Sequence, residues 1–206
     1  MAYRKVDEAS LTAVADSIRA KGGTTGALAF PDGFVSAVQA IQAGGGEADS
    51  SFKDVIERTA VNPTLPSDLT KIGDYAFYNC TSLALTSLPD GVTSIGNSAF
   101  NACSKLALTS LPSSLSNIKG YAFSGCSKIE TISLPGNLQI IGSYSFSGCS
   151  NLSTVTFEGT PFSMESSVFY NCTKLTTINV PWAEGAVANA PWGATNATIN
   201  YNYTGV

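Results

Sequence analysis

The amino-acid sequence predicts a repeat solenoid of the α+β class, and two observations lead to this prediction. Cysteine and phenylalanine each recur with a constant step of 23 residues, at Cys80, Cys103, Cys126, Cys149 and Cys172 and at Phe77, Phe100, Phe123, Phe146 and Phe169. The chain is also 44% hydrophobic, which is ample for a continuous core. A fixed period of about 20 to 50 residues indicates one supersecondary unit stacked on copies of itself, so function is expected on an exposed face.

Residues 1–43 are predicted to form a small unit of two amphipathic helices, followed by a glycine-rich hinge over residues 44–48. Apolar residues recur at helical spacing in two stretches, which are Leu11, Val14 and Ile18, and then Phe30, Phe34, Val38 and Ile41. A unit of about 40 residues rarely buries enough surface to fold alone. We therefore expect these residues to attach the chain to a larger assembly or to a second copy, giving a homo-oligomer. An inert cap on the solenoid is the alternative.

Residues 49–206 are predicted to form the repeat domain, with an N-terminal cap over 49–68, five repeats over 69–182 and a C-terminal cap over 183–206. Leu65 precedes Leu88 by one period, so the strand half of a repeat persists in the first cap. In the second cap, Trp182, Pro191 and Trp192 are expected to cover the end of the core, with a sugar-stacking site as the alternative. A closing strand over 198–204 would place Tyr201 and Tyr203 one period after Ile178 and Val180.

Each repeat is predicted to contain a short helix or 3-10 turn followed by a short parallel strand. The spacing of Ile72, Ala76, Phe77, Cys80 and Leu83 suits one or two helical turns, and the pattern Ile129-x-x-Ile132-x-Leu134 suits a strand. All of these side chains should face inward, and Gly73, Gly96 and Gly142 should allow a tight turn.

Two features of the repeats need separate interpretation. The cysteines are expected to be free, buried thiols, with zinc ligation or disulfides between repeats as alternatives. The first two repeats read LALTSLP and have Thr86 and Thr109 where the next repeat has Ile132, so we expect Leu85 or Leu108 to turn inward there.

The outward positions of the predicted strands carry short polar side chains and form the candidate ligand-binding face. They are Ser87, Ser110, Thr131, Ser133, Thr154, Thr156, Thr177 and Asn179. Hydroxyl and amide groups repeated at about 4.8 Å between strands could hydrogen-bond an extended ligand. The alternative is that these residues serve β propensity and solubility alone. Tyr75, Tyr121 and Tyr144 also recur, and packing at the edge of the core is favoured for them over recognition.

Composition argues against several functional classes. The chain has no histidine and no obvious carboxylate pair, so we expect no enzyme, no metal and no cofactor. A net charge of −4 leaves no basic stripe for nucleic acid. The first residues lack the apolar stretch of a secretory signal, and no run approaches the roughly 18 apolar residues of a membrane span, so neither a signal peptide nor membrane insertion is expected.

The repeated pattern I-G-x-Y-A-F-x-x-C-x-x-L-x-x-I-x-L-P, seen from Ile72 to Cys80 and again from Ile141 to Cys149, resembles the BspA-like leucine-rich repeat family. The resemblance implies a leucine-rich repeat solenoid of a bacterial surface or adhesion protein that binds ligands on its strand face without catalysis.

The segment from Leu11 to Gly23, with Phe30-Pro31-Asp32-Gly33 after it, resembles the opening of tail or virion-surface proteins from phages of Gram-positive gut bacteria. This second resemblance implies a receptor-binding virion adhesin of the tail-fibre type, assembled in the host bacterial cytoplasm. Its helices would bind a virion protein or another copy of the chain, and its solenoid would bind a glycan or protein of the bacterial surface. The alternatives are a structural decoration or spacer of the virion and a bacterial BspA-like cell-surface adhesin.

Overall fold

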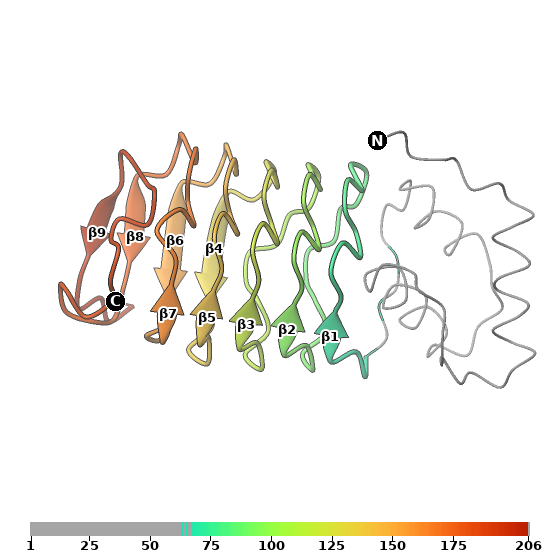
Figure 1. Ribbon diagram of the computed structural model, residues 1–206, viewed down its shortest axis with the longest axis horizontal. Coiled ribbons are helices and arrows are strands. Elements are labelled where there is room, and N and C mark those ends of the chain that lie inside the picture. The colour runs from blue at the N-terminus through green and yellow to red at the C-terminus, as the bar shows by residue number, and fades with distance from the viewer. Residues whose placement is uncertain (1–62, 64, 66, 206) are drawn as a thin grey trace, which may run out of the picture. The chain divides into compact units, whose positions relative to one another are not determined.

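The computed structural model describes residues 63, 65 and 67–205, which form a stack of short turns in which equivalent strands lie side by side (Figure 1). The predicted two-helix unit, its apolar residues from Leu11 to Ile41, the hinge and most of the N-terminal cap lie outside the described residues. Leu65, in that cap, packs against the core as expected.

Two parallel sheets run along the stack. The first sheet has five two-residue strands: β1 (Lys71–Ile72), β2 (Ser94–Ile95), β3 (Asn117–Ile118), β5 (Ile140–Ile141) and β7 (Ser163–Met164). The second sheet has four strands: β4 (Thr131–Leu134), β6 (Thr154–Phe157), β8 (Thr177–Asn179) and β9 (Thr198–Asn200). Pairs such as Ile72 with Ile95 and Ile132 with Val155 keep the 23-residue step, so the predicted parallel solenoid is confirmed.

Each repeat was predicted to contain a short helix or a 3-10 turn, and only the turn is present, because the described residues contain no helix. Amides such as those of Tyr78 and Cys80 donate to the carbonyl oxygen three residues earlier, as in 3-10 turns, at 3.1 Å in both cases. Tyr75 and Asn79 have φ angles of 61° and 60°, in the left-handed region that interrupts a right-handed helix. Their amides donate to the next turn of the solenoid instead, to Asn97 O at 2.8 Å and Asn101 O at 2.7 Å. Ile72, which the helical spacing had included, lies in β1.

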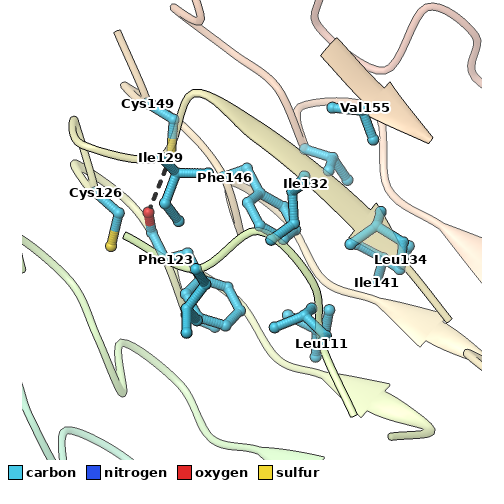
Figure 2. Packing of buried hydrophobic residues seen from close by; sticks show 14 of the residues in the cluster. Leu111, Phe123, Cys126, Ile129, Ile132, Leu134, Ile141, Phe146, Cys149 and Val155 are labelled. Carbon is cyan, nitrogen blue, oxygen red and sulfur yellow. Dashed lines mark hydrogen bonds between the residues drawn. The ribbon is translucent and has the colours of Figure 1, made fainter. Parts of the chain in front are cut away.

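The inward columns of the core are confirmed. The five phenylalanines stack with centroid distances of 5.2, 5.4, 5.1 and 5.9 Å along the solenoid, and all are buried. The side chains at the positions of Ile129, Ile132 and Leu134 fill the space between the two sheets (Figure 2). This continuous apolar column is what holds one turn on the next.

The five cysteines are free and buried, as the sequence indicated. Four of the thiols donate to the phenylalanine carbonyl oxygen of the preceding turn, and Figure 2 shows the bond from Cys149 to Phe123, with an Sγ–O distance of 3.2 Å. The other three bonds, from Cys103, Cys126 and Cys172, measure 2.9, 3.1 and 3.0 Å. A small apolar side chain with one weak donor therefore satisfies a buried backbone acceptor. Burial raises the pKa of Cys126, and the neighbouring Cys103 adds to the effect.

Two of the glycines that were predicted to allow a tight turn, Gly96 and Gly142, are also needed for a second reason. A Cβ atom on Gly142 would lie 2.6 Å from Gly120 N, and one on Gly96 would lie 2.4 Å from Asp74 Oδ1. Close approach of neighbouring turns, rather than a left-handed backbone, therefore requires glycine at these positions.

The C-terminal cap closes the core with two indoles. Trp182 is 6% exposed and Trp192 is fully buried, and their rings lie 5.1 and 6.3 Å from that of Phe157. Trp192 Nε1 donates to Ala188 O at 2.7 Å. This burial confirms the covering role of the two indoles and argues against the sugar-stacking alternative, whereas Pro191 is exposed.

The predicted register of the closing strand is wrong. Ile178 pairs with Ile199, a step of 21 residues, so Tyr201 and Tyr203 do not lie opposite Ile178 and Val180. The strand also ends at Asn200 rather than at residue 204. The loop that carries the indoles lies on the preceding turn, where Phe169 N donates to Trp192 O at 2.9 Å.

Candidate ligand-binding surface

The outer face of the second sheet carries two ladders of polar side chains. The threonine ladder consists of Thr131, Thr154, Thr177 and Thr198, which are paired in register across β4, β6, β8 and β9. The amide ladder lies two residues further along each strand and consists of Ser133, Thr156, Asn179 and Asn200. Alternation along a strand places both ladders on the face opposite the buried Ile132, Val155 and Ile178.

Members of the amide ladder bind one another. Asn200 Nδ2 donates to Asn179 Oδ1 at 2.8 Å, and Asn179 Nδ2 donates to Thr156 Oγ1 at 3.2 Å. Ser133 donates its hydroxyl to Glu158 Oε1 at 2.6 Å. Asn179 is 7% exposed, so this predicted ligand-binding residue has little surface to offer. Each member of the amide ladder therefore already takes part in a hydrogen bond to another side chain of this face.

The threonine ladder is open by comparison. Its side-chain hydroxyls make no hydrogen bond to other described residues, and Thr131 and Thr198 are exposed while Thr154 and Thr177 are half-buried. Each hydroxyl can donate one hydrogen bond and accept two. Neighbouring strands lie about 4.8 Å apart, so the ladder offers a row of regularly spaced donors and acceptors.

The structure does not place all the predicted residues on this sheet. Ser110 forms only an isolated bridge to Ser133, and Ser87 is exposed but belongs to no strand. The cause is a shift of the inward-facing position in the LALTSLP repeats, which we call the inverted phase. Leu108 is 1% exposed and Thr109 is exposed, whereas at the equivalent positions of the next repeat Thr131 is exposed and Ile132 is buried. The expectation that a leucine turns inward there is thus confirmed for Leu108.

Sequence reasoning missed two members of the surface, Thr198 and Asn200. The constant period of 23 residues pointed to Tyr201 instead, whereas the pattern Thr-Ile-Asn is shared by residues 177–179 and 198–200 and could have revealed the true pairing.

The electrostatics of the surface favour a neutral ligand. At the start of β4, Lys128 Nζ pairs with Glu130 Oε1 at 3.1 Å, and Glu158 is held by Ser133. These charged residues flank the ladders, and the side chains of the ladders themselves are all uncharged. Within the described part of the chain, no group of three histidine, cysteine or acidic residues is arranged to hold a metal ion. The surface can bind a ligand by hydrogen bonds.

The recurrent tyrosines lie on a different side of each turn. Tyr75 and Tyr121 are 54% and 45% exposed, and Tyr121 stacks on Tyr144 with a centroid distance of 5.0 Å. Tyr75 meets Tyr78 edge to face at 5.9 Å, and Tyr144 is half-buried. These tyrosines therefore pack partly on other aromatic rings, and their packing at the edge of the core stays a prediction.

No stretch of the described chain forms a helix long and apolar enough to cross a bilayer.

A family model described as a BspA type leucine-rich repeat region, with six copies, matches residues 49–184. Among solved structures, a leucine-rich cell surface protein from Faecalibacterium prausnitzii is similar at 31% identity and a TM-score of 0.54, with 68% of this chain and 38% of that chain covered. A leucine-rich repeat protein from T. pallidum is similar at 35% identity and a TM-score of 0.49, with 57% of each chain covered.

A leucine-rich repeat protein from Bacteroides ovatus is similar at 30% identity and a TM-score of 0.40, with 55% of this chain and 35% of that chain covered. The chain spans less than two thirds of the length of each of these three proteins. None of the curated proteins matches it.

Proposed function

Since the chain belongs to the BspA-type leucine-rich repeat family, we propose that it is a surface-binding protein that acts in adhesion and carries out no catalysis. The similarity to the leucine-rich cell surface protein of F. prausnitzii supports a role at a bacterial surface. Proteins built from such repeats usually present a surface for binding rather than an active site.

The observation that carries the proposal is the threonine ladder. Thr131, Thr154 and Thr177 occur at equivalent positions of three successive strands, and their hydroxyls have no partner among the described residues. An extended ligand laid across the strands, a glycan or protein of the bacterial surface, would gain one or more hydrogen bonds at each turn. Each such bond contributes roughly 0.5–1.5 kcal/mol, so a row of them gives useful affinity without any charge.

The experiment is cell binding by the full chain. A fluorescently labelled protein should bind bacterial cells in flow cytometry, and the triple variant Thr131→Ala, Thr154→Ala, Thr177→Ala should bind at least about tenfold more weakly because it loses several hydrogen bonds. The matched control changes three exposed threonines outside the second sheet, Thr160, Thr173 and Thr195, to alanine and should bind like the unmodified chain. Equal binding by both triple variants would refute the role of the ladder.

A virion location is a second candidate, and it depends on the resemblance of residues 11–33 to phage tail and virion-surface proteins. In that case the N-terminal residues would bind a virion protein or another copy of the chain, and linked copies would raise avidity by about 100-fold or more. A related possibility is that the chain is a structural decoration or spacer of the virion and binds no receptor. Antibody labelling of intact bacterial cells and of phage particles from the same culture separates the locations, because only one of the two should carry the protein.

A further inference from the structure

Three tyrosines pack on one another along the turns that follow the first sheet. This tyrosine edge consists of Tyr121, Tyr144 and Tyr170. The rings of Tyr121 and Tyr144 are stacked at 5.0 Å and 10°, and Tyr144 meets Tyr170 edge to face at 5.9 Å and 79°. Tyr121 and Tyr170 are 45% and 57% exposed, and Tyr144 between them is half-buried, so the two outer members present most of the ring surface.

The conformation of the turn does not require tyrosine at these positions. Tyr121 and Tyr144 have φ angles of 56° and 57°, in a left-handed region that favours glycine and asparagine and disfavours bulky side chains. Serine occupies the equivalent position of the second repeat, at Ser98, and the turn closes there with the same backbone. A strained backbone that presents an exposed ring points to a binding role.

The surroundings of the tyrosine edge identify the kind of ligand. The three turns over residues 119–124, 142–147 and 165–170 carry two charged side chains, Lys119 and Glu165, and several serines. Lys119 Nζ lies 3.6 Å from Asp74 Oδ1, so its charge is largely balanced. Aromatic rings flanked by hydroxyls with little charge suit a neutral ligand that has both apolar and hydrogen-bonding faces.

We propose that the tyrosine edge is a second binding surface, distinct from the threonine ladder, and that its ligand is a neutral polysaccharide. The faces on which Tyr121 and Tyr144 stack are occupied, so the C–H faces of sugar rings would pack against the outward-facing parts of the tyrosine rings. The phenol and serine hydroxyls would bond the sugar hydroxyls. Turns of the solenoid repeat at about 4.8 Å, close to the length of one sugar unit, so successive rings could engage successive tyrosines.

The test is affinity electrophoresis of the full chain in native gels that contain mixed-linkage β-glucan, xylan, galactomannan or starch. At least one polysaccharide should retard the protein. The double variant Tyr121→Asn, Tyr144→Asn should lose about tenfold or more in affinity, because each stacked ring contributes substantially to binding. Its unfolding midpoint should stay within about 3 °C of the unmodified chain, since asparagine occupies the left-handed positions of Asn79 and Asn171.

Two controls sharpen the result. Phe162→Ala removes another aromatic side chain, 91% exposed and outside the tyrosine edge, and should be retarded like the unmodified chain. The double variant Tyr121→Phe, Tyr144→Phe keeps the rings and should retain most of the binding. The threonine triple variant should also be retarded normally, so failure of the ladder proposal and failure of this one give different patterns.

Several results would overturn the inference. One is the absence of retardation by all four polysaccharides, including the case in which the chain binds only proteins of the cell surface. Another is equal retardation of the asparagine double variant. A third is a fall of its unfolding midpoint well beyond about 3 °C, which would show that the tyrosines are retained for the fold.

Discussion

The first two described repeats and the three that follow share one core but differ on the strand face. Phenylalanine, cysteine and leucine columns run through all of them without a break. The later repeats form β4, β6 and β8, whereas the earlier ones contribute only a bridge at Ser110. A shift of the inward position by one residue, from Ile132 to Leu108, accompanies the loss of the strand. Core packing and strand formation are thus separable within one solenoid.

The largest expected effect tests the shared core. Phe100→Ala and Phe146→Ala, one in each region, should each lower the free energy of unfolding by about 3–5 kcal/mol, because both rings are fully buried between stacked neighbours. Urea unfolding followed by circular dichroism measures both. Losses that differ by several kcal/mol would show that the two regions do not have equivalent cores.

The next prediction tests the inverted phase directly. Leu108→Ala should cost about 2–5 kcal/mol because the side chain is 1% exposed, whereas Thr131→Ala at the equivalent position of the next repeat should change the free energy of unfolding by less than about 0.5 kcal/mol. The same unfolding measurement serves for both variants. Similar costs at the two positions would contradict the phase shift.

One later repeat carries a polar defect that the earlier repeats lack. Ser145 is fully buried and its Oγ has no hydrogen-bond partner, while Ala99 and Ala122 occupy the equivalent positions of the preceding turns. Ser145→Ala should therefore raise the free energy of unfolding by about 1–3 kcal/mol, the cost of burying an unpaired hydroxyl. Thermal unfolding monitors the change, with the exposed Ser150→Ala as a neutral control. A destabilised Ser145→Ala variant would contradict the assignment.

Moving the inward-facing position of the second repeat by one residue should add a strand to the second sheet. The double variant Leu108→Thr, Thr109→Ile gives the second repeat the pattern of the third, so a strand over residues 108–111 is expected beside β4. Stability should change by less than about 1.5 kcal/mol, because one buried aliphatic side chain replaces another. Hydrogen exchange read on peptides that contain residues 105–112 should slow. Unchanged exchange would mean that another feature of LALTSLP prevents the strand.

The smallest effect concerns a carboxylate present in the first repeat. Burial acts to raise the pKa of Asp74, but hydrogen bonds from the Asn97 side chain and backbone and the charge of Lys119 outweigh it and leave the pKa lowered. A lowered pKa means that Asp74 contributes stability above its ordinary value of 3.8 and that this contribution is lost as the pH falls through the lowered pKa.

Asp74→Asn should consequently unfold more easily than the unmodified chain at neutral pH, and the difference should shrink as the pH falls below 3.8. Unfolding midpoints over a pH series measure it, and Asp90→Asn, at an exposed aspartate, serves as the control. A difference that stays constant with pH would show that charge is not the cause.

Much of the candidate surface could be predicted from the strand pattern, and the failures have physical causes. Thr131, Thr154 and Thr177 were placed correctly, because alternation about Ile132, Val155 and Ile178 determines which side chains face outward. Ser87 was assigned to a strand that does not form, because a repeated apolar spacing does not show whether the backbone pairs with its neighbour. The engagement of Asn179 with Thr156 depends on a contact between residues 23 positions apart, which no local pattern displays.

The sequence by itself determined the period, the inward columns and the burial of the thiols, because each follows from side-chain polarity repeated at a constant spacing. The tertiary structure alone decided that the residues between Ile72 and Leu83 are turns rather than a helix, and that the last turn pairs with a step of 21 residues. The physical reason is that alternate backbone amides in this segment donate to the next turn of the solenoid, as Phe77 N does to Ala99 O, and not to a carbonyl four residues away as in an α-helix. That choice of acceptor depends on the stacked neighbour and not on the local sequence.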